Sequence, residues 1–135
     1  MSETRVDVRP LRPEDEPLLF GLARLDRGAD QRTLDVLEAA TVFVAEVGGS
    51  PAGYVALALT EATARVDQLF VSPEHEREGV GRRLLEYAEG YAIFEGAATL
   101  QVVVEDENRR AHDFYRGRGF VSIGENVLEL VLPQV

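Results

Sequence analysis

The chain has 135 residues, which is long enough for one domain with a hydrophobic core of its own. Hydrophobic residues make up 45% and charged residues 28%, a balance that excludes bulk disorder. The formal net charge of −10 argues against nucleic acid as a partner, and the absence of cysteine excludes disulfides, thiolate metal sites and cysteine nucleophiles. No apolar run approaches the roughly 20 residues of a membrane span, so we expect a cytoplasmic protein without a membrane partner.

The first forty residues predict one strand and two helices. Residues 5–9 alternate between polar and apolar side chains, as a strand with one buried face does. Pro10 and Pro13 interrupt this pattern, and acidic residues suited to a helix N-terminus follow. Residues 32–40 indicate a short helix, and before it four leucines at helical spacing indicate another (Leu18, Leu19, Leu22 and Leu25).

The middle of the chain predicts an antiparallel meander with short connections. Residues 42–47 and 53–59 form strands, and residues 48–51 form the glycine-rich turn between them. A second turn at residues 61–63 leads into a third strand, residues 65–71. Tight turns of this kind place consecutive strands side by side in one sheet.

A helix and another strand follow this meander. The helix runs from Gly81 to about Tyr91, because apolar residues recur every three to four positions, and residues 99–104 form a strongly β-branched strand. A strand, a crossover helix and a second strand imply a parallel pair with a right-handed connection. The sheet is therefore expected to be mixed.

The last third of the chain predicts a helix and a closing hairpin. Asn108 is suited to cap the helix, and Gly117 and Gly119 are suited to end it. Residues 120–123 and 127–132 form the two strands of the hairpin. With no internal repeat or linker, the chain reads as one α/β domain.

Residues 72–89 combine a charged turn, two glycines and the start of a helix. The first N–H groups of a helix have no partner, and the helix dipole adds positive potential there. Gly79 and Gly81 allow an anion to approach the backbone closely, so the segment suits a phosphate group. Taken alone, however, the two glycines favour a plain strand-to-helix turn.

A second motif, Asn-x-x-Ala-x-x-Phe-Tyr-x-x-x-Gly-Phe, covers residues 108–120. Together with Val71-Ser72-Pro73 and residues 76–81, it resembles the GNAT superfamily of acetyl-CoA-dependent N-acetyltransferases. The resemblance implies a single N-acetyltransferase domain over residues 1–135, with a mixed, mostly antiparallel sheet flanked by helices. It also implies a splayed parallel strand pair that forms a slot for acetyl-CoA as co-substrate, without a metal.

The resemblance assigns the diphosphate of coenzyme A to the glycine-bearing loop and the pantetheine arm to the strand before it. The expected cofactor-binding residues are Leu69, Val71, Arg77, Glu78, Gly79, Val80, Gly81, Arg82, Asn108 and Tyr115. Glu76 departs from the family pattern, which has Arg or Gln at this position. Arg77, Arg82 and Arg83 offset its charge, since guanidinium recognises phosphate, although an exposed helix face also explains Arg82 and Arg83.

Tyr115 is the expected catalytic acid. In the family, the tyrosine of this motif donates a proton to the thiolate of coenzyme A as it leaves. A phenol with a pKa near ~10 is protonated at neutral pH and can make this donation. The alternative is that Tyr115 only packs in the core with Phe114 and Ala111.

The amine that attacks the thioester must also lose a proton. If the family geometry holds, Asp67 and Glu105 lie near the slot and are the expected bases, either directly or through water. His75 and His112 are expected at the surface, and two histidines without matching carboxylates indicate no metal site.

These features predict direct acetyl transfer from acetyl-CoA to a primary amine in a ternary complex. The acceptor is a small molecule or a peptide, and its pocket is expected from residues 13–40 and 120–132. A non-catalytic acyl-CoA-binding or regulatory module with the same fold is the alternative, and transfer of a larger acyl group also stays open. Many relatives form dimers through the C-terminal strands, which leaves a homodimer open as well.

Overall fold

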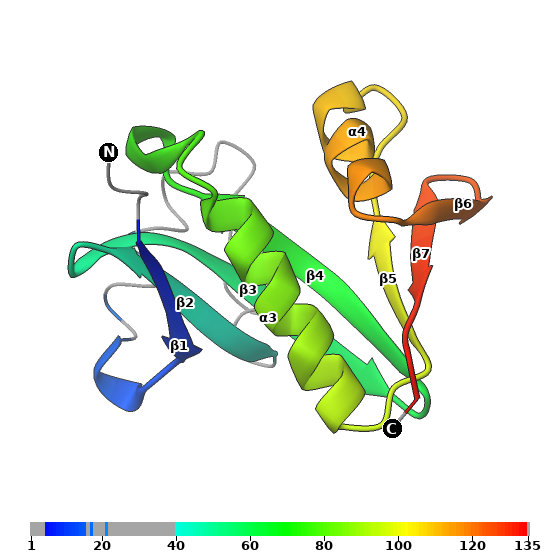
Figure 1. Ribbon diagram of the computed structural model, residues 1–135, viewed down its shortest axis with the longest axis horizontal. Coiled ribbons are helices and arrows are strands. Elements are labelled where there is room, and N and C mark those ends of the chain that lie inside the picture. Colours follow the sequence, from blue (N-terminus) through cyan, green and yellow to red (C-terminus); the bar gives the residue numbers. More distant parts are fainter. Residues whose placement is uncertain (1–4, 16, 18–20, 22–39, 135) are drawn as a thin grey trace. The chain divides into compact units, whose positions relative to one another are not determined.

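The computed structural model describes residues 5–15, 17, 21 and 40–134 of the chain (Figure 1). The two helices expected before residue 41 fall largely outside these residues. The chain forms two compact units: unit 1 comprises Met1–Leu57 and Gln68–Ala88, and unit 2 comprises Ala58–Asp67 and Glu89–Val135.

The described elements are seven strands, two α-helices and two 3-10 helices, where η marks a 3-10 helix. They are β1 (Val6–Pro10), η1 (Pro13–Asp15), β2 (Thr41–Val47), β3 (Ser50–Thr60), β4 (Thr63–Val71), η2 (Pro73–His75), α3 (Val80–Phe94), β5 (Thr99–Val103), α4 (Arg109–Gly117), β6 (Val121–Gly124) and β7 (Val127–Val131). The strands form a seven-stranded sheet in the order β1-β2-β3-β4-β5-β7-β6. Neither α3 nor α4, the two α-helices that the structure describes in full, is long and apolar enough to cross a membrane.

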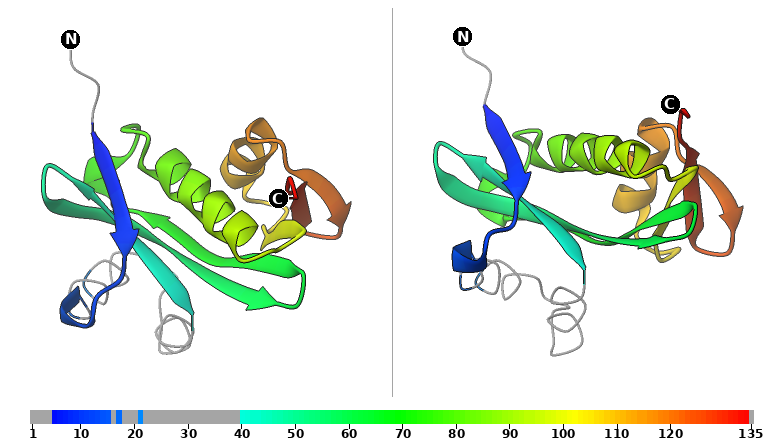
Figure 2. Two further views of the ribbon diagram at one scale, coloured as in Figure 1. Left: turned by 60° about the horizontal axis from the view of Figure 1, so that its bottom comes forward. Right: turned by 90° about the horizontal axis from the view of Figure 1, so that it is seen from below.

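Unit 1 is built on antiparallel strands, with β1 along the edge of β2 and β2 beside β3 (Figure 2). The turn between β2 and β3 is Gly48 and Gly49, whose φ values of 59° and 83° are those of a two-residue hairpin turn. The first turns of α3 pack on these strands, where the rings of Phe43 and Tyr87 lie 4.7 Å apart. The largest fully buried side chains of this unit are Val44, Tyr54, Val55, Leu57, Val80, Leu84 and Leu85.

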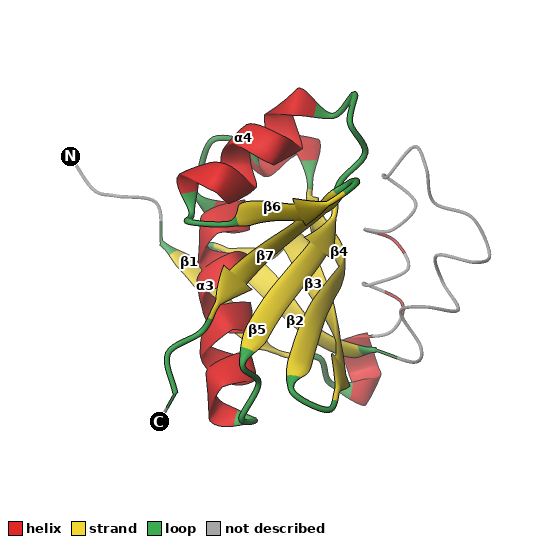
Figure 3. Ribbon diagram, turned by 90° about the vertical axis from the view of Figure 1, so that its right-hand side faces the viewer, coloured by secondary structure: helices red, strands yellow, loops and turns green. Residues whose placement is uncertain are grey.

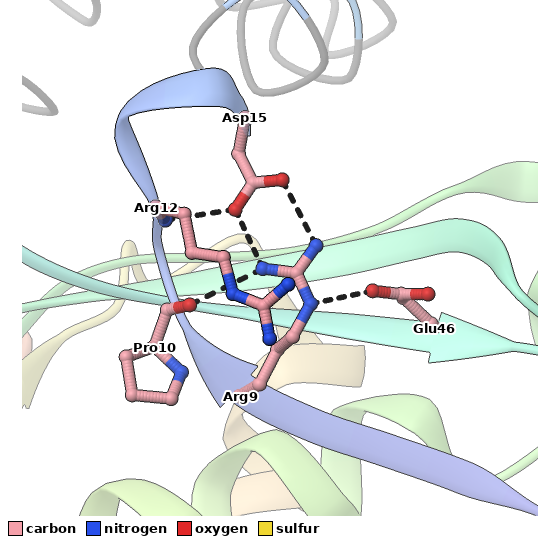
Figure 4. A network of polar contacts seen from close by, with 5 residues as sticks. All are labelled: Arg9, Pro10, Arg12, Asp15 and Glu46. Carbon is pink, nitrogen blue, oxygen red and sulfur yellow. Dashed lines mark hydrogen bonds and ion pairs between the residues drawn. The ribbon is translucent and has the colours of Figure 1, made fainter.

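A charged cluster ties β1, η1 and β2 together (Figure 4). The Arg9 guanidinium donates through Nη2 to Asp15 Oδ1 at 2.9 Å and through Nε to Glu46 Oε1 at 2.6 Å. Asp15 Oδ2 also accepts from the Arg12 amide at 2.8 Å. The Arg9 hydrogen bonds, and then the Arg12 amide, lower the pKa of the buried Asp15 to about 2. The same contacts raise the pKa of Arg9, so both charges persist at neutral pH.

Unit 2 contains the parallel pair. The ladder between β4 and β5 runs from Thr63–Thr99 to Val66–Val102, and β4 then continues to Val71. β5 and β6 each pair antiparallel with β7, so the three strands lie side by side (Figure 3). The prediction of an α/β fold with a mixed, mostly antiparallel sheet is thereby confirmed.

The structure differs most from the predicted boundaries at two places, and the other boundaries differ by at most two residues. α3 ends at Phe94 rather than near Tyr91, because Ala92 is fully buried and Gly96 supplies the left-handed residue that ends the helix, with φ 83°. β3 begins before the predicted strand and includes Pro51, which lies opposite the irregular step in β2 between Ala45 and Glu46. A bulge of this kind accommodates a residue without an N–H group.

Candidate active site

The predicted phosphate loop lies in unit 1 between β4 and α3. Its start is fixed because the Ser72 amide donates to Ala52 O on β3 at 2.8 Å. The chain then passes through η2 and turns with two residues in the left-handed region, Arg77 at φ 66° and Gly79 at φ 81°. Glycine adopts this conformation freely, whereas arginine is strained there. Two reversals in three residues bring the chain to the start of α3 at Val80.

The first turn of α3 contains no acidic residue, so its amides offer an anion site without a carboxylate on the same turn. The acidic residues of the segment lie before this turn or after it, in the second and third turns of α3. Glu76 is exposed, and Glu86 pairs with Arg83 at 3.0 Å and with Arg82 at 3.8 Å. The Arg82 and Arg83 side chains are thus exposed and ion-paired along the helix.

His75 is not the surface residue that the sequence suggested. Its side chain is only 16% exposed, and its Nδ1 lies 2.9 Å from Glu78 Oε2. This contact closes the turn across three residues and draws the Glu78 carboxylate towards η2. The His75–Glu78 and Arg83–Glu86 contacts therefore keep part of the charge of the loop within the segment.

The strand that enters the loop, β4, loses its regular alternation of burial after Val66. From Asp67 to Val71 every residue is half-buried. A Cβ atom added at Gly53 on β3 would lie 2.4 Å from the Phe70 carbonyl oxygen and 3.3 Å from Val71 Cα. Only glycine permits this approach, so Gly53 sets the path of the segment that includes Leu69 and Val71.

The second predicted motif forms α4 and its flanks in unit 2. Asn108 caps the helix as predicted, with Oδ1 accepting from the Ala111 amide at 3.1 Å. The helix ends where the amides of Gly119 and Phe120 donate to the carbonyls of Arg116 and Tyr115, and Gly119 has φ 98°. The motif residues thus fix both ends of a nine-residue helix.

Tyr115 lies on the buried side of this helix. It is 5% exposed, and its ring makes edge contacts with Phe114 and Phe120 at centroid distances of 5.1 and 5.3 Å. Burial raises the pKa of the Tyr115 hydroxyl well above its ordinary value of 10.0, so the phenol stays protonated at neutral pH. Tyr115 forms no hydrogen bond through its hydroxyl to any residue that the structure describes.

The two predicted bases differ in their surroundings. Asp67 is 16% exposed in its side chain and accepts from Arg65 Nε at 2.6 Å. Glu105 follows β5 and is exposed, and its backbone carbonyl accepts from His112 Nε2 at 3.1 Å. His112 was expected at the surface, but its Nδ1 is buried. Among the described residues, no group of three or more His, Asp or Glu side chains is placed to hold a metal.

The contacts of two residues of this region, Gly53 and His112, were not predicted from the sequence. Gly53 interrupts a strand pattern, and an isolated glycine in a strand signals a close backbone approach. His112 is three positions before Tyr115, and that helical spacing places both on neighbouring parts of one helix surface. Neither the isolated glycine nor the helical spacing predicts which residue is contacted, which is Phe70 for Gly53 and Glu105 for His112.

The parallel strand pair, the glycine-bearing turn into α3 and the capped α4 together define an acetyltransferase-like α/β protein. The sequence model of the acetyltransferase (GNAT) family matches residues 6–120, and the chain belongs to this family.

Individual relatives match over part of their length. The chain is 33% identical over 85 residues to an N-acetyltransferase of Methanocaldococcus jannaschii, a match that covers 58% of this chain and 38% of that protein. The chain spans 38%, 55% and 57% of the first three curated relatives.

Solved structures match over nearly the whole chain. The ribosomal-protein-S18-alanine N-acetyltransferase of Escherichia coli is 21% identical, with a TM-score of 0.81 over 96% of this chain and 94% of that one. The PaiA N-acetyltransferase of Thermoplasma acidophilum in complex with coenzyme A is 18% identical, with a TM-score of 0.77 over 95% and 99%. At these identities the likeness shows the fold.

Proposed function

We propose that the protein transfers the acetyl group of acetyl-CoA to a primary amine by direct attack in a ternary complex. The observation that carries this proposal is Tyr115, a buried and protonated phenol on the helix formed by the family motif. Membership of the acetyltransferase family supports the reaction class, and the coenzyme A in the Thermoplasma acidophilum structure supports the cofactor.

Within unit 1, we assign the diphosphate of coenzyme A to the amides around the start of α3. These belong to Arg77, Glu78, Gly79, Val80, Gly81 and Arg82. The half-buried backbone at Leu69 and Val71 is assigned to the pantetheine arm and to the oxyanion of the tetrahedral intermediate. Backbone recognition explains why Glu76 is tolerable, because an exposed carboxylate can turn to solvent without moving the amides.

Within unit 2, we assign Tyr115 to protonate the leaving thiolate and Asn108 to contact the pantetheine arm. The amine nitrogen attacks the thioester carbonyl carbon, the C–S bond breaks, and the Tyr115 hydroxyl donates its proton to sulfur. Burial raises the pKa of the phenol, and it also makes a desolvated thiolate more basic than in water. The pKa values of the proton donor and of the acceptor therefore rise together, and the phenol can still donate to the thiolate. Asp67 and Glu105 stay candidates for the amine proton.

The acceptor is proposed as a class: a primary amine on a small molecule or a peptide. The net charge of −10 favours a cationic amine, because a negative field raises its local concentration. A homodimer through the C-terminal strands stays a prediction.

A thiol-release assay with a panel of amines tests the proposed function. The chain has no cysteine, so free thiol detected in the assay comes from coenzyme A. Alkylamines, amino acids and short peptides with free N-termini are offered with acetyl-CoA. At least one amine is expected to release thiol and gain 42 mass units, roughly one acetyl group, with Tyr115→Phe as the inactive comparison. Binding of acetyl-CoA without release on any amine would instead support the non-catalytic module.

A further inference from the structure

A contact between two side chains bridges the turn that precedes α3. His75 Nδ1 lies 2.9 Å from Glu78 Oε2, and both residues are half-buried. A carboxylate only accepts, so Nδ1 carries the hydrogen and donates it. The two residues between them, Glu76 and Arg77, are exposed. Of residues 75–78, the two least exposed are thus the two whose side chains meet.

The two ends of this contact are anchored to different parts of unit 1. At one end, the His75 amide donates to Ser72 O at 2.9 Å, and the Ser72 amide donates to Ala52 O on β3 at 2.8 Å. At the other end, Glu78 is followed by Gly79, whose carbonyl oxygen accepts a backbone hydrogen bond from α3 at 3.1 Å. The contact therefore connects a point fixed to the sheet with the start of the helix.

The backbone between the two side chains needs such a bridge. Arg77 has φ 66°, a left-handed conformation that a residue other than glycine adopts only at a cost in free energy. Without a bridge, the turn at Arg77 can relax to an ordinary conformation, and the amides that follow it would then change direction. The contact from His75 to Glu78 opposes this relaxation because it fixes the distance across the turn.

The same contact separates the charges of the loop. It holds the Glu78 carboxylate beside η2. The Arg82 guanidinium lies against the turn instead, with Nη2 3.7 Å from the position that a Cβ atom of Gly79 would take. A carboxylate without a partner would compete with a bound anion for the amides at the start of α3, since those amides attract any negative group. His75 supplies this carboxylate with a donor of its own.

We propose that His75 and Glu78 are positioning residues whose contact holds the loop in the shape in which the amides of residues 77–82 bind the diphosphate of coenzyme A. The inference rests on the proposed function, and neither side chain needs to touch the ligand. Charge alone predicts that removal of the Glu78 carboxylate strengthens the binding of an anion. Loss of the contact predicts the opposite, so the sign of the change separates the two.

Five variants distinguish positioning from charge and from packing. Glu78→Ala and His75→Ala each remove one partner, and the double variant completes a thermodynamic cycle. His75→Asn keeps a donor near the position of Nδ1 and is the conservative replacement. Glu74→Ala removes the same charge as Glu78→Ala, at an exposed position on η2, and is the matched control.

The dissociation constant for acetyl-CoA is measured by calorimetric titration. We expect it to rise about 10-fold in Glu78→Ala, in His75→Ala and in the double variant, because the same contact is lost in each. His75→Asn and Glu74→Ala should stay within about 3-fold of wild type. With the amine found in the screen, the KM for acetyl-CoA should rise in the three variants that lose the contact, while kcat at saturation stays within about 3-fold.

The inference is overturned if Glu78→Ala binds acetyl-CoA as tightly as wild type or more tightly. It is also overturned if the losses add to about 100-fold in the double variant, or if His75→Asn binds as weakly as His75→Ala. A lower unfolding midpoint in the alanine variants with an unchanged dissociation constant would make the contact structural only, and would overturn it as well. A wild-type protein that does not bind acetyl-CoA overturns the proposed function together with this inference.

Discussion

The loop of residues 72–83 in unit 1 and the α4 segment of residues 108–120 in unit 2 carry the two family motifs in opposite ways. In the loop, the His75 side chain is paired with Glu78, and the exposed Arg82 and Arg83 guanidinium groups are paired with Glu86. In α4, the Tyr115 side chain is buried, and His112 Nδ1 is buried without a partner among the described residues.

From this difference we infer which substitutions each motif tolerates. The site proposed for the loop is made of amides and depends on the path of the chain, so we expect Glu76 to be tolerated there. A site made of side chains depends on the identity of each atom. Of the four substitutions that follow, Tyr115→Phe tests α4, Gly53→Ala and Glu76→Gln test the loop, and Asp15→Asn tests a buried charge outside both regions.

The largest effect is expected at Tyr115. Tyr115→Phe removes one oxygen from a packed site, so kcat should fall about 100-fold or more because the thiolate loses its proton donor. The dissociation constant for acetyl-CoA and the unfolding midpoint should stay close to wild type, measured by calorimetric titration and by thermal unfolding. Turnover of Tyr115→Phe at the wild-type rate would show that Tyr115 has no role in catalysis and only packs in the core.

In the loop, the largest effect is expected from a substitution that displaces the backbone, at Gly53. In Gly53→Ala the new Cβ would meet the Phe70 carbonyl oxygen at 2.4 Å, so β4 must shift. We expect a loss of about 2 kcal/mol in unfolding free energy and a weaker affinity for acetyl-CoA. Gly90→Ala on α3 is the control, because nothing lies within 4 Å of its Cβ position, and it should stabilise the helix by about 0.5–1 kcal/mol. Unchanged stability of Gly53→Ala would contradict the close approach.

A charged side chain is expected to contribute to stability only where its ion pair is buried. Asp15→Asn should cost about 2 kcal/mol at pH 7, because it breaks the hydrogen bonds from Arg9. The folded-state pKa of Asp15, about 2, lies below its ordinary value of 3.8. Its contribution is therefore present above about pH 4 and is lost as the pH falls towards 2, where wild type and variant should converge. Asp7→Asn, in the exposed pair with Arg5, should change stability by less than about 0.5 kcal/mol at every pH.

The smallest effect is expected from the side chain that departs from the family pattern. Glu76→Gln removes one exposed negative charge from the loop, so acetyl-CoA should bind only about 3-fold more tightly at low salt, and the gain should shrink as salt is added. Asp7→Asn removes the same charge outside the loop and serves as the comparison. A gain of about 100-fold would show that side-chain charge, and not the backbone, governs the loop.

The sequence predicts the strands well because alternation and turn residues are local signals. The β2–β3 turn at Gly48 and Gly49 and the Asn108 cap are formed as predicted. What it could not predict depends on contacts between distant residues. The bond from Arg9 to Glu46 joins positions 37 apart, and the approach of Phe70 to Gly53 depends on how β4 runs beside β3.

The candidate site divides in the same way. The family motifs name Tyr115 and the loop, because those residues follow a fixed spacing. The partner of Nε2 in His112 is a backbone carbonyl, which exists at every residue and so leaves no mark in the sequence. Its unpartnered Nδ1 becomes visible only once α4 is placed beside the end of β5.

The most direct test of acetyl-CoA use is the thermal unfolding midpoint with and without acetyl-CoA. A ligand that binds only the folded state at about 100 times its dissociation constant adds about 2.7 kcal/mol, which for a chain of this length raises the midpoint by about 10 °C. We predict a rise of this size, which would mean that the loop binds coenzyme A despite Glu76. An unchanged midpoint at millimolar acetyl-CoA would contradict the proposed function.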